Sequence, residues 1–170
     1  MDEATDTVEV FARDLVRACP HIEREASVRN LEVLAGDIST RQYIRVFLTG
    51  SKSESVMLMR LSGQMGPVGG GKRGSSQDDT FVELQSFLAA HDIPVPKILL
   101  DARKQQALLV EDVGDLALWN IATGEVQLED EKGYSDALSV SAEGYFRKAI
   151  ELIGRLQRIP PDPDCVRLFS

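Results

Sequence analysis

The sequence has few of the residues that metal sites and disulfide frameworks need, with two cysteines and two histidines in 170 residues. Cys19 and Cys165 lie near opposite ends of the chain, and neither belongs to a CxxC pair. Structural zinc sites use Cys and His at short spacings. The composition therefore predicts two ordinary reduced thiols and no metal site.

Positive charge is also scarce, with 19 Lys plus Arg against 27 Asp plus Glu and a net charge of -8. A surface that neutralises nucleic-acid phosphates needs a basic face. This balance argues against nucleic acid as a partner. It does not argue against a basic pocket of a few residues.

Long apolar runs are missing as well. None approaches the roughly 20 residues that a membrane-spanning helix needs. The acidic start, MDEATDTVEVFARDL, lacks the basic and apolar regions of a secretory signal. We therefore expect no membrane partner and a cytoplasmic location. The 43% hydrophobic and 27% charged residues are typical of a globular chain that buries a core.

Apolar residues recur at helical spacing in three segments, which predict helices at about residues 5–18, 80–91 and 141–158. Apolar and β-branched runs predict strands at 31–35, 43–48, 55–61, 98–101 and 107–111. One helix thus falls between the third and fourth strands. The pattern predicts an α+β fold with a five-stranded antiparallel sheet and one packed helix.

A glycine-rich stretch at 62–79 is predicted to be a mobile loop. Its sequence GPVGGGK, at 66–72, fits the GxxxxGK pattern of a phosphate-binding P-loop. However, Pro67 removes an amide donor, and Arg73 stands where a Ser or Thr would hold magnesium. A P-loop NTPase is therefore kept as an alternative hypothesis.

Three motifs follow one another in order: LAGDISTRQYIRV, IPVPKILL and ALLVEDVGD. With the order of the predicted elements, they resemble the aminoglycoside phosphotransferase family of protein-kinase-like folds, nearest to its bacterial branch that phosphorylates cell-wall sugars. RKAIELIGRLQRI resembles the first helix of that fold's large lobe. The resemblance implies an amino-terminal helix and connector at 1–29 and an ATP-binding small lobe at 30–115. At 116–170 it implies the segment after the hinge and the start of a truncated large lobe.

The first motif implies a turn that binds phosphate. Glycine turns the backbone without a Cβ, and Ser and Thr hydroxyls with successive amides can donate hydrogen bonds to phosphate oxygens. An arginine, Arg41 or Arg45, adds positive charge. The site residues predicted here are Gly36, Asp37, Ser39, Thr40 and Arg41.

In kinase-like folds a cation on the third strand holds the phosphates and pairs with a glutamate of the next helix. Glu83 is the matching acid. Met59 stands where the resemblance places the lysine, and Arg60 follows it. Because strand residues alternate between faces, only one of these two can face the helix. Two interpretations stay open. Arg60 and Glu83 form the phosphate clamp, or Arg60 is a solvated edge residue and Glu83 lies on an exposed helical face.

The third motif resembles the hinge between the two lobes. The resemblance implies that the carbonyl of Glu111 and the amide of Val113 meet the edge of adenine, with Val46 and Val110 lining its apolar pocket. The alternative is a plain strand end with a turn at Gly114.

The family's catalytic motif, HxDxxxxN, does not occur, since the histidines lie in HIE and HDI. Its aspartate orients and deprotonates the acceptor hydroxyl. We therefore expect the ATP-binding portion of a phosphotransferase for a sugar or aminoglycoside-like hydroxyl, inactive alone, with Mg²⁺ bound only together with the large lobe. Exposed apolar surface and self-association are expected where that lobe would dock. A non-catalytic nucleotide-binding or interaction module is the alternative.

Overall fold

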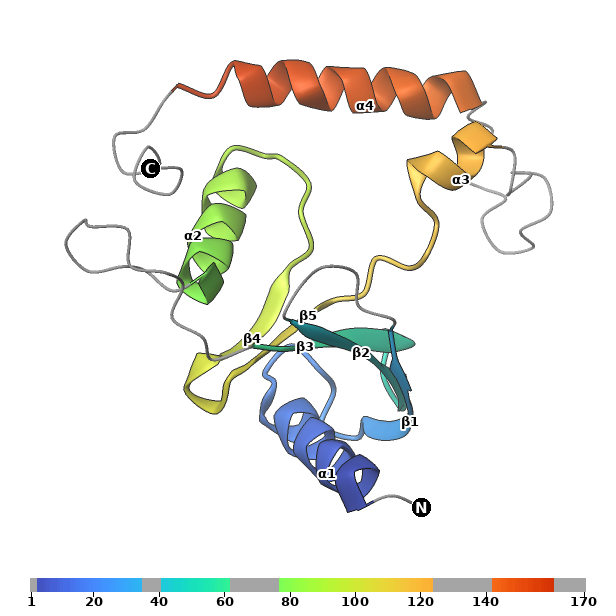
Figure 1. Ribbon diagram of the computed structural model, residues 1–170, viewed down its shortest axis with the longest axis vertical. Coiled ribbons are helices and arrows are strands. Elements are labelled where there is room, and N and C mark those ends of the chain that lie inside the picture. Colours follow the sequence, from blue (N-terminus) through green and yellow to red (C-terminus); the bar gives the residue numbers. More distant parts are fainter. Residues whose placement is uncertain (1–2, 35–40, 62–76, 124–141, 161–170) are drawn as a thin grey trace. The chain divides into compact units, whose positions relative to one another are not determined.

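The computed structural model describes residues 3–34, 41–61, 77–123 and 142–160 (Figure 1). The chain divides into two compact units. The first unit comprises Met1–Phe87 with Val95–Val113, and the second comprises Leu88–Pro94 with Gly114–Ser170. The sheet lies entirely in the first unit, so this unit determines the geometry of the predicted small lobe.

The described helices are α1 (Glu3–Ala18), α2 (Gln77–Ala90), α3 (Leu118–Thr123) and α4 (Ala142–Gln157), with a 3-10 turn at Arg103–Gln105. The three predicted helices correspond to α1, α2 and α4. The short α3 falls where no element was predicted. Within the described residues, no helix is long and apolar enough to cross a membrane.

The strands are β1 (Ser27–Val33), β2 (Gln42–Thr49), β3 (Ser55–Arg60), β4 (Ile98–Ala102) and β5 (Ala107–Glu111). They form one sheet in the order β1-β2-β3-β5-β4, and every neighbouring pair is antiparallel. The predicted α+β fold with a five-stranded antiparallel sheet is therefore confirmed. Only β1 starts well before its predicted position. It is an edge strand whose polar residues can face solvent, so its first half lacks the apolar signal of a strand.

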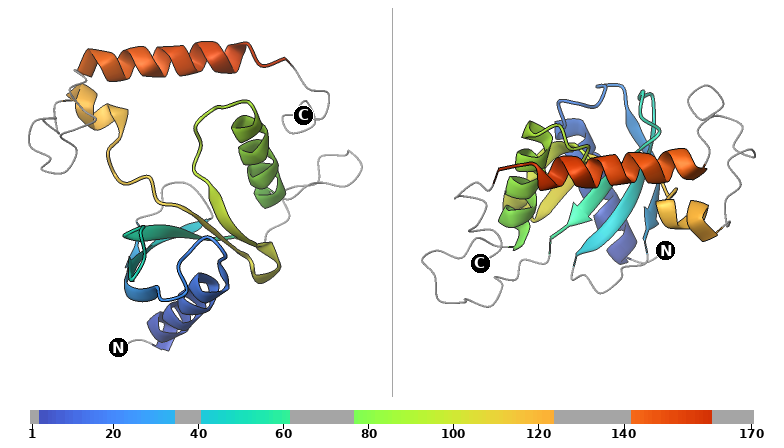
Figure 2. Two further views of the ribbon diagram at one scale, coloured as in Figure 1. Left: turned by 180° about the vertical axis from the view of Figure 1, so that it is seen from behind. Right: turned by 90° about the horizontal axis from the view of Figure 1, so that it is seen from above.

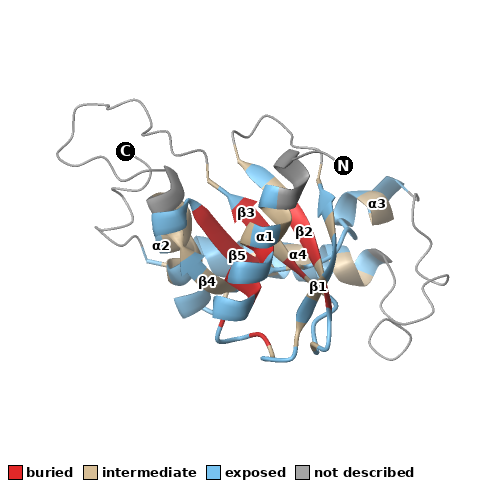
Figure 3. Cartoon of the chain, turned by 90° about the horizontal axis from the view of Figure 1, so that it is seen from below, coloured by how far each residue is buried: buried red, intermediate tan, exposed pale blue. Residues whose placement is uncertain are grey.

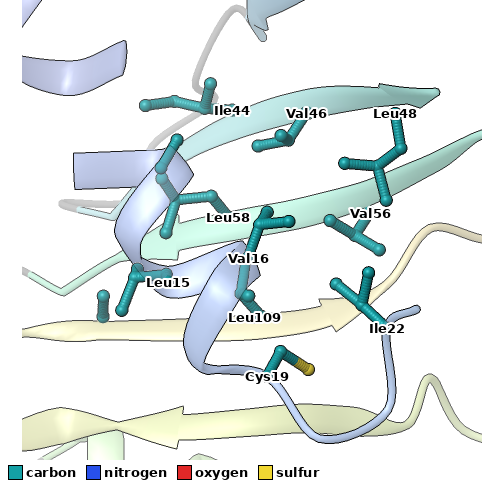
Figure 4. Packing of buried hydrophobic residues seen from close by; sticks show 12 residues of the cluster. Leu15, Val16, Cys19, Ile22, Ile44, Val46, Leu48, Val56, Leu58 and Leu109 are labelled. Atoms are coloured by element: carbon teal, nitrogen blue, oxygen red, sulfur yellow. The ribbon is translucent and has the colours of Figure 1, made fainter. Parts of the chain in front are cut away.

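α1 packs against one face of the sheet, which we call the α1 face (Figure 2). Leu15, Val16 and Cys19 recur at helical spacing and turn toward the strands (Figure 4). The buried cluster consists of Ala12, Leu15, Val16, Cys19, Ile22, Ile44, Val46, Leu48, Val56, Leu58, Ala107 and Leu109. The Cys19 thiol donates a hydrogen bond to the Leu99 carbonyl at 3.4 Å, and burial raises its pKa.

The opposite face carries a second cluster built on Met59, Leu108 and Val110. Phe81 and Val82 of α2 pack against it, and we call this side the α2 face. Because strand side chains alternate, β2, β3 and β5 send residues into both clusters. These three strands are accordingly the most buried part of the sheet (Figure 3). Their side chains on the α2 face are the ones that a ligand on that face would contact.

Candidate functional site

The two candidate clamp residues on β3 face opposite sides of the sheet. Met59 is fully buried in the cluster of the α2 face. Arg60 is exposed and lines a cavity of about 210 Å³ with residues of α1, among them Val8 and Phe11. Glu83 is exposed on α2, and the described residues show no ion pair between it and Arg60. The pair predicted to clamp phosphate is therefore not brought together, because alternation sends Arg60 to the α1 face.

Arg41 lies next to α2. Its guanidinium carbon is 5.3 Å from the centroid of the Phe81 ring, within the range of a cation–π contact. Arg41 directly precedes β2 and follows the predicted phosphate-binding turn. The other predicted residues of that turn, Gly36, Asp37, Ser39 and Thr40, lie outside the described residues, as does the GPVGGGK motif.

A buried ion pair joins β2 to the residue that follows β5. The Nε of Arg45 lies 2.6 Å from the Oδ2 of Asp112, and its Nη2 lies 3.3 Å from Oδ1. The Ser55 hydroxyl donates to the same Oδ2 at 2.7 Å. The side chains of Arg45 and Asp112 are only 9% and 4% exposed. Arg45, considered above as a phosphate contact, is thus paired with the residue that directly follows β5.

The segment after β5 combines fixed side chains with an open amide. The Glu111 N–H donates to the Lys97 carbonyl at 2.8 Å, and the Lys97 N–H donates to the Glu111 carboxylate at 3.1 Å. Val113 is 70% exposed, and its amide donates no hydrogen bond within the described part of the chain. This amide is therefore a candidate donor for a ligand.

The two valines expected to line an adenine pocket do not share a face. Val46 belongs to the α1 cluster, and Val110 belongs to the cluster of the α2 face. Met57, the cross-strand partner of Val110, lies on the α2 face instead. The sequence pattern did not separate these residues, because β2 is apolar on both faces.

The second unit carries a row of exposed apolar side chains on α4. Phe146, Ile150, Ile153 and Leu156 recur at spacings of three and four, and they are 39%, 68%, 56% and 48% exposed. Helices of this pattern normally bury such a row. α4 therefore presents an exposed row of apolar side chains.

No protein-family model matches the chain, and neither the curated proteins nor the solved structures include a significant match. The proposals below therefore rest on the residues and their geometry.

Proposed function

We propose that the first unit is the ATP-binding small lobe of a phosphotransferase that resembles the aminoglycoside phosphotransferase family. The observation that carries this proposal is the position of β5 beside β3 in the sheet. The hinge segment thus leaves the sheet next to the strand on which kinase-like folds place their phosphate-binding cation. A second observation supports the proposal. The helix α2 follows β3 in the chain and precedes β4, and its Phe81 and Val82 pack against the α2 face of the sheet.

ATP would bind on the α2 face with its base toward the hinge. The main chain of Glu111 and Val113 supplies an acceptor and a donor that match the edge of adenine, and Met57 with Val110 supplies apolar surface for the ring. At the other end, Arg41 and the residues predicted to bind phosphate at 36–40 would contact the phosphates. Arginine suits this role because its guanidinium forms charge-assisted hydrogen bonds with phosphate oxygens.

Phosphoryl transfer to a sugar or aminoglycoside-like hydroxyl needs further groups. Among the described residues no three His, Cys, Asp or Glu side chains gather where they could hold a metal ion. The sequence also contains no HxDxxxxN motif. We propose that this chain supplies nucleotide binding, and that the rest of a large lobe, packed on the exposed apolar row of its first helix α4, supplies the Mg²⁺ site and the catalytic aspartate. Without that lobe, the same surface would promote self-association.

A non-catalytic nucleotide-binding module is favoured by one observation, the burial of Met59 where a catalytic kinase-like lobe has its lysine. The coding sequence downstream distinguishes the two. An in-frame HxDxxxxN motif shortly after this segment supports an enzyme, whereas a stop codon without a partner reading frame supports the module.

Isothermal titration calorimetry of the purified chain with Mg-ATP tests the proposal. We expect saturable binding that Lys72→Ala leaves unchanged. A collapse of binding in Lys72→Ala would instead support the P-loop alternative. Absence of heat and of any thermal shift at millimolar Mg-ATP contradicts both.

A further inference from the structure

The buried pair of Arg45 and Asp112 joins strands that are far apart in the sequence. Arg45 lies on β2, Ser55 begins β3, and Asp112 follows the last residue of β5. The pairing register places Arg45 beside Met57 and Met57 beside Val110, so Arg45 reaches across β3 to the end of β5. Its guanidinium thereby connects three strands to the hinge.

The Asp112 carboxylate is held from several directions at once. It accepts two hydrogen bonds from Arg45 and one from Ser55, at 2.6, 3.3 and 2.7 Å. Arg45 also lies 3.9 Å from the carboxylate of Glu32, which is half exposed. A bidentate arginine fixes direction as well as distance, because its two N–H groups are coplanar. The carboxylate therefore has one well-defined orientation.

The preceding residue is held on the other side. Glu111 exchanges hydrogen bonds with Lys97, just before the edge strand β4, through its amide and its carboxylate. Successive residues of an extended chain point in opposite directions, so Glu111 and Asp112 are fixed from opposite sides. The amide of Val113 is the next donor along the chain.

Stability alone does not explain an ion pair at this position. Replacing a buried ion pair by packed apolar residues is often neutral or stabilising, because both charges lose their hydration. In some proteins a buried pair is retained because it imposes a single arrangement. Here that arrangement lies in the residues proposed to meet adenine.

We infer that Arg45 and Ser55 are positioning residues, which hold Asp112 so that the main chain of 111–113 is oriented to bind a purine base. This inference rests on the proposed function. The phosphates would lie elsewhere, because Gln42, which follows Arg41, pairs with the last residue of β3, whereas Asp112 accepts a hydrogen bond from the first. Loosening Asp112 should therefore weaken recognition of the base and spare recognition of the phosphates.

The test compares Asp112→Asn and Ser55→Ala with the control Asp101→Asn. Asp101 also binds an arginine, Arg103, but at the exposed turn between β4 and β5. Amide hydrogen exchange of residues 111–113 is measured in the ligand-free chain, and the affinities for ATP and for inorganic tripolyphosphate are measured by calorimetry. Tripolyphosphate reports on phosphate contacts without a base.

We expect Asp112→Asn to speed exchange at the hinge and to lower the ratio of ATP to tripolyphosphate affinity by about tenfold, since a charged hydrogen-bonded group is lost. Ser55→Ala, the milder change, should shift both readouts in the same direction, and Asp101→Asn should shift neither. Unchanged hinge exchange, or equal loss of both ligands with faster exchange across the sheet, overturns the inference. If the wild-type chain binds neither ligand, the proposed function fails, and hydrogen exchange still decides whether the pair fixes the hinge.

Discussion

Met59 and Arg60 are neighbours on β3, yet Met59 is buried on the α2 face while Arg60 lines a cavity beside α1. The alternation of strand side chains makes these two positions exclusive. Neither residue therefore supplies a cation of β3 to the α2 face. We therefore propose Arg41, which lies against Phe81, as the cation that contacts the phosphates.

Replacing Arg41 should weaken nucleotide binding, whereas replacing Arg60 should not. A lost charge-assisted hydrogen bond reduces affinity by about tenfold or more. We expect this loss in Arg41→Ala, and we expect Arg60→Ala to bind Mg-ATP like the wild type, because its side chain is on the other face. Calorimetry on both variants checks this. A larger loss in Arg60→Ala would place the phosphates on the α1 face and contradict the proposed site.

Arg45→Ala should strongly destabilise the first unit. The change removes both Arg45 hydrogen bonds from the buried Asp112 carboxylate, and breaking a buried pair costs about 3–5 kcal/mol. Arg103→Ala is the matched control. It breaks an exposed pair with Asp101 and should cost at most about 1 kcal/mol. Urea unfolding at neutral pH measures both values, and equal losses would contradict the burial of the Arg45 pair.

Acid should remove a contribution of Glu23 to stability. The hydrogen bond from Ser51 is the main cause that lowers the pKa of Glu23 below its ordinary 4.5, and the Lys52 amide adds to it. A carboxyl group with a lowered folded pKa stabilises the fold above its unfolded pKa and loses this effect as pH falls through the folded pKa.

The difference in urea midpoint between wild type and Glu23→Gln should therefore be present at pH 7 and shrink as the pH falls below about 4.5. Ser51→Ala should show the same trend, since it removes the donor. A difference that stays constant with pH would show that the Glu23 charge is not involved.

The exposed row on α4 should promote self-association. Ile150 and Ile153 are among its most exposed members, and replacing both by glutamate puts charge in the centre of the row. We expect the average mass of the chain in sedimentation velocity at high concentration to fall toward that of the monomer. Arg147→Glu, on the same helix outside the row, serves as the control. Equal effects of the two changes would indicate a response to charge alone.

The sequence predicted most elements because their patterns are local. β5 was predicted at its observed bounds, since the apolar run at 107–111 lies between polar turns. The six-residue α3 was missed, because it is too short to show helical spacing.

The candidate site was less predictable because it depends on pairing between distant segments. Arg45 and Asp112 are 67 residues apart, and they meet only because β3 lies between β2 and β5. Whether Met59 or Arg60 occupies the clamp position likewise depends on which face of the sheet α2 packs against. Local spacing contains neither piece of information.

The most direct test of the account follows the Val113 amide in a ¹⁵N-labelled chain titrated with Mg-ATP. We predict a saturable chemical-shift change at Val113 and its neighbours in the hinge, reproduced by adenosine alone, while the amides of α1 stay unchanged. An ATP titration that saturates with shifts elsewhere and leaves Val113 unmoved would contradict nucleotide binding at this hinge.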